Sequence, residues 1–376
     1  LLLDGARKPG AKILVAGGGR CNVTHHAVDE TAYAGASRHA SKKVLRRFDV
    51  PQTIAFFRDY GVELKREPTG KLFPVSDDAH TVLDALLLAA RQADVRLRTP
   101  YRVEAIARTE HGFTVSGSWG AVIASRVILA TGGKALPKSG SDGQGYTLAQ
   151  ALGHTLTERI TPALVPLLLP SDHFIYALSG LTLPTALELR SSQGKLLARF
   201  ADSTLCTHFG LSGPAVLDMS RYYLDVVADD PGCTLSINWL LDTPSDTLDS
   251  VLQRAGRVTL LKHFSGLLPE RLLRAVCAHI GIEPATTAAA LTREQRRALV
   301  AALTQMPLPI SGNRGYTYAE VTAGGVPLSQ LHLATMESRV CPGLYLCGEL
   351  CDVDGRIGGF NFQWAWASGY VAGSAV

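Results

Sequence analysis

The sequence has neither a long apolar run nor a strong excess of either charge. Its most apolar stretch, residues 164–169, is far shorter than the roughly 18 residues of a membrane helix, and Pro166 interrupts it. Lysine and arginine number 37 against 33 aspartate and glutamate, a net charge of only +4. That balance is too small to indicate binding to nucleic acid or to a membrane surface. We therefore expect no membrane association and no nucleic-acid partner.

Cysteine is present, but without the spacings of a metal site or a disulfide framework. The seven cysteines are scattered and contain no Cys-x-x-Cys pair. We predict no metal site and no disulfides, and a reducing cytoplasm is the expected compartment. The N-terminal segment lacks the pattern of a signal peptide, so we expect no secretory leader. We interpret Cys347 and Cys351 as small packing residues at the end of a buried strand.

The chain is long enough for more than one domain. For 376 residues, 46% of them apolar, we expect two or three domains with a sizeable core. Helical periodicity covers residues 42–60 and 80–93, and short strand signals follow at 101–123. The apolar run at 127–130 then ends abruptly in glycines. This alternation indicates an α/β fold with an antiparallel accessory sheet.

The composition changes near Thr161. A proline-punctuated β-like stretch contains a hairpin turn at 192–194, and residues 247–305 are helical, with a capping box expected from Thr292 to Gln295. The simplest architecture is one α/β domain that flanks a large insertion. We expect residues 1–163 and 316–376 to form the two parts of that domain, 164–245 a β-rich insertion and 246–315 a small helical domain.

Glycines cluster at four predicted strand ends or loops. The clusters are Gly17-Gly18-Gly19, Thr131-Gly132-Gly133, Gly324-Gly325 and Gly358-Gly359. Backbone without side chains lets a large ligand approach closely, and open α/β sheets bind ligands at the ends of their strands.

The first four residues, Leu1-Leu2-Leu3-Asp4, are typical of a buried strand that ends in an acid. In a dinucleotide fold such an acid accepts the ribose hydroxyls, but the G-x-G-x-x-G loop that precedes it there is absent. From the residues alone, a dinucleotide fold and a generic turn-rich α/β enzyme are about equally favoured.

The last glycine cluster opens a helix with Phe362, Trp366 and Tyr370 on one face. Its first turn offers unpaired N–H groups and the positive end of the helix dipole. Directed at the pyrimidine edge of a flavin, these groups would stabilise the negative charge that develops on reduction. The alternative is a structural turn before a packing helix.

Six segments together resemble the BaiN-like NAD(P)/FAD-dependent oxidoreductases, which include aminoacetone oxidase and bile-acid-pathway reductases. In order, the segments are residues 17–24, 70–76, 130–133, 207–214, 321–326 and 348–363. The resemblance covers essentially the whole chain and implies a Rossmann-like FAD domain of the two-dinucleotide-fold type with inserted β-rich and helical domains. The family's first 20–30 residues, roughly, have no counterpart here, which we interpret as truncation.

The resemblance also implies the residues that contact FAD. They are Asp4, Lys12, Gly18, Gly19, Arg20, Cys21, Asn22, Val103, Thr131, Gly132, Gly133, Gly348, Glu349, Asp352, Asp354, Gly358, Gly359, Phe360 and Asn361. Asp4 matches the ribose-binding acid, Lys12 would lie against the pyrophosphate, and Val103 would contact adenine through its backbone. Gly348 and Glu349 would hold the ribityl chain.

Catalysis in such a protein falls mainly to the flavin, so few side chains need to react. His208 is our candidate for a proton donor or substrate anchor, because histidines exchange protons near neutral pH. The alternative is a structural histidine in a glycine–proline turn. Cys21 has no paired cysteine nearby in sequence, which disfavours a disulfide reductase.

We therefore predict an FAD-dependent oxidoreductase that moves hydride between flavin and a small or medium organic substrate. An NAD(P)H-linked reductase and an amine-type oxidase are both consistent with this prediction. The alternative is an RNA-modification or RNA-binding protein on the same fold without independent redox turnover. The basic stretch that includes Arg38, Lys42, Lys43, Arg46 and Arg47 we interpret as a solvated helix face. The sequence carries no signal for the oligomeric state.

Overall fold

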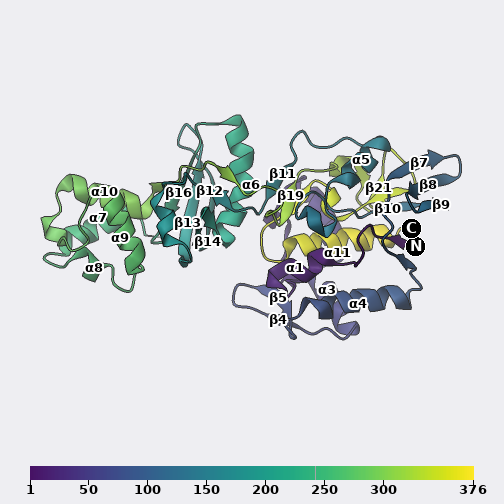
Figure 1. The fold of residues 1–376 in the computed structure, drawn as a ribbon, viewed down its shortest axis with the longest axis horizontal. Coiled ribbons are helices and arrows are strands. Elements are labelled where there is room, and N and C mark those ends of the chain that lie inside the picture. The colour runs from purple at the N-terminus through teal and green to yellow at the C-terminus, as the bar shows by residue number, and fades with distance from the viewer. Residues whose placement is uncertain (242) are drawn as a thin grey trace. The chain divides into compact units, whose positions relative to one another are not determined.

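The structure is a computed structural model that describes residues 1–241 and 243–376. The chain divides into two units (Figure 1). Unit 1 comprises residues 1–163 and 316–376, and unit 2 comprises residues 164–315. Helices and strands occur in both units, as expected for an α/β protein. The subdivision of residues 164–315 into a β-rich and a helical domain stays a prediction.

Unit 1 contains several small sheets, and three of them pair a strand from before residues 164–315 with a strand from after them. These three are β10 (Val127–Leu129) beside β22 (Leu344–Leu346), β11 (Thr161–Ala163) beside β19 (Val321–Ala323), and β3 (Tyr33–Gly35) beside β23 (Val353–Gly355). The β10–β22 pair is parallel and continues into β21 (Glu337–Ser338) and β20 (Leu331–His332). Because these pairings bridge the insertion, residues on either side of it meet at shared strand ends.

The other strands of unit 1 form smaller groups. They are the parallel pair β1 (Leu2–Leu3) and β6 (Leu97–Arg98), the sheet β2 (Thr24–His25), β5 (Lys71–Pro74) and β4 (Leu64–Arg66), and the meander β7 (Ala105–Thr109), β8 (Gly112–Gly117) and β9 (Gly120–Ala124). The meander confirms the accessory sheet. The expectation of a buried first strand was wrong: Leu1 and Leu2 are 56% and 47% exposed, and β6 is the only strand among the described residues that pairs with β1.

The helices of unit 1 agree with the periodicity except at one break. They are α1 (Ala11–Val15), α2 (Arg38–Leu45), α3 (Val50–Asp59), α4 (Ala79–Gln92), α5 (Gln144–Ala151) and α11 (Phe360–Gly373). The helical periodicity expected over 42–60 corresponds to two helices, α2 and α3. Asp49 accepts a hydrogen bond from the backbone N–H of Gln52, whose side chain binds back to Asp49, so a capping box starts α3 anew.

Unit 2 is built on a seven-stranded antiparallel sheet. Its order is β17 (Met306–Pro307), β16 (Thr234–Asn238), β13 (Thr182–Arg190), β14 (Leu196–Thr207), β15 (Gly210–Ser212), β12 (Leu167–Leu168) and β18 (Gly312–Asn313). Its helices are α6 (Pro214–Asp229), α7 (Ser245–Arg254), α8 (Leu260–His263), α9 (Glu270–His279) and α10 (Arg293–Thr304). The hairpin turn at 192–194 and the capping box from Thr292 to Gln295 are both confirmed.

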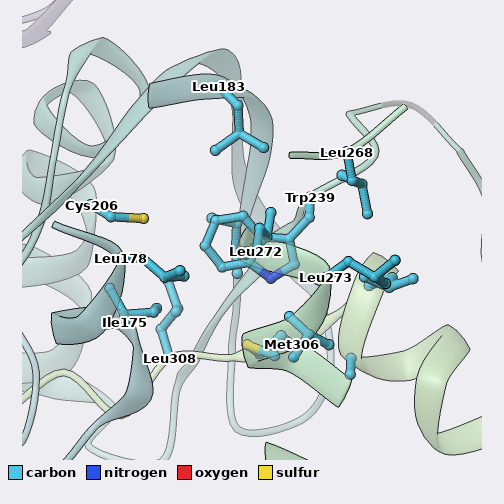
Figure 2. Close-up of a cluster of buried hydrophobic side chains, with 14 of the residues drawn as sticks. Ile175, Leu178, Leu183, Cys206, Trp239, Leu268, Leu272, Leu273, Met306 and Leu308 are labelled. Atoms are coloured by element: carbon cyan, nitrogen blue, oxygen red, sulfur yellow. The ribbon is translucent and has the colours of Figure 1, made fainter. Parts of the chain in front are cut away.

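One apolar cluster fills unit 2. It runs from Leu187 in the sheet to Leu272 and Leu299 in the helices, all of them fully buried. Figure 2 shows the Trp239 ring surrounded by aliphatic side chains of this cluster. The residues expected to form a separate helical domain therefore share their core with the sheet.

Two expectations concern residue types rather than elements. Cys347 directly follows β22, and Cys351 follows the 3-10 turn at residues 348–350; both are buried free thiols, as predicted for packing residues. Among the described residues, no helix has both the length and the apolar content that a membrane crossing requires.

Candidate functional site

The first glycine loop follows α1 and turns in the left-handed region of φ. Gly17, Gly18 and Gly19 have φ values of 58°, 70° and 86°. A Cβ on Gly17 would lie 2.7 Å from the Phe73 ring, whereas a Cβ on Gly18 would meet nothing within 4 Å. Glycine adopts this conformation freely, and the loop presents bare backbone on its open side.

Two residues at the end of this loop are buried. Cys21 is 0% exposed, and burial raises the pKa of its thiol to about 12, so the thiol stays protonated and is a poor nucleophile. Asn22 is 9% exposed, and its Oδ1 is a buried acceptor without a hydrogen-bond partner in the described part of the chain. An unpaired buried acceptor is costly and is the kind of atom that a ligand satisfies.

Arg20 is held by neighbours within unit 1. Its guanidinium lies over the Phe73 ring, 4.1 Å from the centroid, and pairs with Glu67 at 2.7 Å and Asp77 at 3.6 Å. The hydrogen bond to Glu67 raises the pKa of Arg20. The guanidinium charge of Arg20, a predicted FAD contact, is thus already compensated by two acids.

Lys12 of α1 and Glu349, in the turn after β22, form the centre of a second group that also includes Thr322 of β19 and Gly133 in the loop after β10. Lys12 Nζ lies 2.5 Å from Glu349 Oε2, although 337 residues separate them in sequence. Glu349 Oε1 accepts a hydrogen bond from the Thr322 N–H at 2.9 Å. A Cβ on Gly133 would lie 2.5 Å from Thr322 Oγ1 and 2.8 Å from Glu349 Oε1, so only glycine fits there.

Thr322 is a member of this group that sequence reasoning missed. Its Oγ1 accepts hydrogen bonds from the backbone N–H groups of Lys134 and Ala135 and thereby holds the loop after Gly133. The available signal was a threonine in a short buried strand directly before the Gly324-Gly325 pair. Sequence alone could not identify its partners, which lie 187 and 188 residues away.

The loop after β10 packs tightly against the segment that starts α5. A Cβ on Gly132 would lie 2.6 Å from Ser141 Oγ, and a Cβ on Gly145 would lie 1.8 Å from Thr131 Oγ1. Ser141 Oγ is buried without a partner among the described residues, a second unsatisfied polar atom of the kind found at Asn22.

The C-terminal glycine turn is pressed against β2. Gly359 has a φ of 94°, and a Cβ there would lie 2.5 Å from the Thr24 carbonyl carbon. Phe360 is buried, stacked on His25 at 4.9 Å and in edge contact with Tyr33 at 6.2 Å. Asn361 donates to the carbonyl of Gly355 and accepts from its N–H, each at 2.8 Å. The Phe360 and Asn361 side chains thus brace the turn and leave its backbone to contact a ligand.

Helix α11 ties two glycine segments together through buried polar side chains. Gln363 Oε1 accepts from the Thr24 hydroxyl at 2.7 Å and the Thr53 hydroxyl at 3.0 Å, and its Nε2 donates to the Phe48 carbonyl at 2.9 Å. The Trp364 indole donates to the Gly348 carbonyl at 3.0 Å. Sequence reasoning missed Gln363, although a polar residue in an aromatic-rich helix was a usable signal.

Asp4 and the segment before Val103 lie side by side at another part of unit 1. The Tyr101 N–H donates to the Asp4 carbonyl at 2.8 Å, and Asp4 Oδ1 accepts from the Ala6 N–H at 2.8 Å. A polar pocket of about 450 Å³ begins at the neighbouring Arg102. Its lining residues are Arg102, Lys134, Asp142, Gly143, Gln144, Tyr146, Thr147, Leu156 and Ile160.

Of the other predicted residues, Asp352 and Asp354 lie at β23 in unit 1, and His208 lies in unit 2. Asp352 precedes β23 and Asp354 lies within it, and a Cβ on Gly35 would lie 2.7 Å from Asp352 Oδ1. His208 belongs to unit 2, where it is exposed at the turn between β14 and β15 and makes edge contact with Phe209 at 5.0 Å. The structure therefore gathers Lys12, Gly133 and Glu349 into one group, whereas His208 belongs to a different unit.

Comparison with known proteins adds independent information. A family model described as the HI0933-like protein Rossmann domain matches residues 1–375. The chain is 34% identical over 379 residues to the 3-dehydro-bile acid delta(4,6)-reductase of Clostridium scindens, covering 100% of this chain and 92% of that protein. It is 35% identical over 375 residues to the ribosomal RNA dihydrouridine synthase of Escherichia coli, covering 99% and 90%. The protein of that same name from Haemophilus influenzae is 29% identical over 386 residues, covering 100% and 92%.

These matches span the whole chain and confirm the resemblance inferred from the six sequence segments, as well as the Rossmann-type α/β class. The names of the relatives describe two kinds of substrate, a bile acid and ribosomal RNA. The chain belongs to the HI0933-like Rossmann-domain family.

Proposed function

We propose that this protein is an FAD-dependent reductase that saturates a carbon–carbon double bond. The observation that carries the proposal is the meeting of Lys12, Gly133 and Glu349 at shared strand ends. This is the place where open α/β sheets bind large ligands. Nearby segments supply bare glycine backbone and unsatisfied buried polar atoms.

The residues present fit FAD. Asn22 Oδ1 and Ser141 Oγ are buried polar atoms without partners among the described residues, which suits a ligand rich in hydroxyl and amide groups. The open side of Gly18 leaves room for close approach of a phosphate. We propose that Lys12 neutralises the pyrophosphate, that Glu349 holds the ribityl hydroxyls, and that Asp4 binds the adenosine ribose.

When bound, FAD would supply hydride to the substrate after receiving it from NAD(P)H. The chain's own part is electrostatic. The first turn of α11 has no side-chain cap, so its N–H groups and dipole are available to stabilise negative charge. The protonated thiol of Cys21 contributes no competing nucleophile. His208 stays our proposal for the proton donor.

Reduction of a double bond is favoured by the names of the relatives. A delta(4,6)-reductase removes unsaturation from a steroid ring, and a dihydrouridine synthase makes the saturated form of uridine. Both names describe addition of hydrogen across a carbon–carbon double bond, whereas neither describes amine oxidation. The reductase is therefore preferred to the oxidase, with either a small-molecule enone or a uracil ring in RNA as the substrate.

The test begins with the visible spectrum of the purified full-length protein. We expect flavin absorbance, bleached by NADPH under anaerobic conditions and restored by a conjugated enone or by uridine-containing RNA. Gly133→Val should abolish flavin retention because its side chain would overlap Thr322 and Glu349, whereas Gly373→Ala, which adds a Cβ in open space at the end of helix α11, should retain the flavin. A colourless protein that gains no flavin from added FAD would contradict the proposal, as would a bound flavin that NADPH leaves oxidised.

A further inference from the structure

One face of strand β5 lies against two of the glycine segments. Lys71 and Phe73 are two residues apart on this strand, so their side chains leave it on the same side. A Cβ on Gly17 would lie 2.7 Å from the Phe73 ring, and a Cβ on Gly358 would lie 3.6 Å from Lys71 Cε. The segment 70–76 helped to indicate the family, yet none of its residues is among the predicted FAD contacts. This face of β5 therefore places Lys71 at the turn that precedes α11.

Lys71 differs from the other partly buried lysines of unit 1 in having no partner for its charge. The others are held by a carboxylate or, in one case, by the Tyr316 ring at 4.8 Å; they are Lys12, Lys42, Lys65 and Lys134. Among the described residues, Lys71 has neither an acidic nor an aromatic partner. Removing an ammonium group from water is costly unless an opposite charge compensates it. An anionic ligand would supply the missing partner.

The acids nearest to Lys71 in sequence are held by other cations. Glu67 pairs with Arg20 at 2.7 Å, and Asp77 pairs with Lys65 and, at 3.6 Å, with Arg20. The hydrogen bond from Lys65, with the charges of both cations, holds the pKa of Asp77 below its usual value. These acids are therefore already compensated without Lys71.

The residue opposite Lys71 has both of its polar atoms in hydrogen-bonding contacts. His25 faces Lys71 across the β2–β5 pair. Its Nδ1 lies 2.8 Å from the Ala27 carbonyl oxygen, and its Nε2 lies 3.1 Å from the Thr69 carbonyl oxygen. Its ring stacks on Phe360 at 4.9 Å. His25 thus braces the turn before α11, whereas the Lys71 ammonium group is left for a ligand at that turn.

We propose that Lys71 stabilises the negative charge that the flavin ring gains on reduction. The proposal rests on the proposed reductase function and adds a residue to its site. A hydride from NAD(P)H carries two electrons and one proton; NAD(P)⁺ leaves, and one negative charge stays with the reduced ring. An ammonium group beside Gly358 attracts that anion but gains little from the uncharged oxidised ring, because a Coulomb attraction needs both charges. Lys71 therefore favours the reduced over the oxidised cofactor.

The experiment measures the midpoint potential of the holoenzyme, by reduction with dithionite beside an indicator dye. Lys71→Met and Lys71→Gln remove the charge and keep much of the stem that packs on Gly358, whereas Lys71→Arg keeps the charge. The matched control is Lys42→Gln, because Lys42 is also partly buried in unit 1 but pairs with Glu30. The neutral variants should bind reduced relative to oxidised flavin about tenfold more weakly. For a two-electron couple, this lowers the midpoint potential by about 30 mV. Lys71→Arg and the control should stay within about threefold of wild type, or roughly 15 mV.

Three outcomes would overturn the role of Lys71. One is an unchanged potential in both neutral variants, including the case in which only the KM for an acidic substrate rises, since Lys71 would then bind substrate. Another is an equal shift in Lys42→Gln, which would indicate a general effect of net charge. The third is a folded neutral variant that no longer binds oxidised FAD, because the proposal assigns Lys71 to the reduced state.

The proposed function fails by a different result. Because dithionite needs neither NADPH nor a substrate, a wild-type flavoprotein that NADPH leaves oxidised would contradict the reductase function and leave the potential shift at Lys71 measurable. Normal reduction by NADPH with an unchanged potential would contradict the role of Lys71 alone. A wild-type protein that binds no FAD would contradict both.

Discussion

The two units differ in the buried polar atoms that lack a hydrogen-bond partner among the described residues: most of these atoms lie in unit 1, whereas one apolar cluster runs through the sheet and the helices of unit 2. Unsatisfied buried atoms among the described residues follow the same division. Asn22, Ser141 and His154 lie in unit 1, and only Trp239 lies in unit 2. Buried polar groups without partners destabilise a fold unless a ligand or water satisfies them. Unit 1 therefore has the features of a ligand-binding unit, and unit 2 is stabilised by its own core.

The largest expected effect is from Gly359→Ala in unit 1. The new Cβ would lie 2.5 Å from the backbone of Thr24, and the residue would be held at a φ of 94°. We expect a loss of about 3 kcal/mol or more in the free energy of unfolding, together with loss of bound flavin. Gly369→Ala in the same helix is the matched control, because a Cβ there meets nothing within 4 Å. It should be neutral or stabilising by up to about 1 kcal/mol. An equal change in the free energy of unfolding for the two variants, measured by denaturant titration, would contradict the expectation that only position 359 requires glycine.

Leu272→Ala should be nearly as damaging, but to unit 2. Leu272 is fully buried in the cluster that Figure 2 shows, and removing its side chain leaves a cavity. We expect a loss of about 2 to 5 kcal/mol in chemical unfolding followed by intrinsic fluorescence. Flavin absorbance under native conditions should be unchanged. Release of flavin at native temperature would contradict the separation of roles between the two units.

A matched pair of tryptophan substitutions should have a smaller effect. Trp239 and Trp364 are each 1% exposed, but the Trp364 indole donates to the Gly348 carbonyl, while the Trp239 indole N–H has no partner among the described residues. Trp364→Phe should cost about 1 to 2 kcal/mol more than Trp239→Phe, which removes an unsatisfied donor. The comparison is made by thermal unfolding of each variant. A larger loss from Trp239→Phe would indicate that its N–H is satisfied by bound water.

The smallest effect concerns the pH dependence of unit 1. Burial lowers the pKa of His154, whose Nδ1 binds Gln330 Oε1 at 2.8 Å. The folded state therefore holds this ring neutral, and the unfolded state binds a proton more readily as the pH falls below about 6.5. Stability from this site is present above that pH and declines below it, by at most about 1.4 kcal/mol per pH unit.

His154→Asn keeps a donor near Gln330 without titrating, so it should flatten the acid side of the stability curve. The exposed His111→Asn should leave that curve unchanged. Parallel curves for wild type and His154→Asn between pH 5 and pH 7, roughly the range in which histidine titrates, would contradict the assignment.

Local signals predicted most of the elements. The periodicity of residues 80–93 predicted α4 within one residue at each end, and the Thr292 capping box predicted the start of α10. The break between α2 and α3 was missed, although Asp49 and Gln52 carry the same cap signature in sequence. The predicted burial of the first strand failed because burial depends on neighbouring strands that local sequence does not specify.

For the candidate site too, local sequence predicted some features and the folded chain was needed for others. Local sequence was enough to predict glycine-rich turns, because a left-handed turn such as that at residues 17–19 depends on the residue at each position. The order of motifs along the chain was enough to indicate the family. The partners of the polar side chains required the folded chain: Lys12 meets Glu349 across 337 residues, and Thr24 meets Gln363 across 339. Such contacts, like the burial that keeps Cys21 protonated, arise from packing between distant segments, which no local pattern encodes.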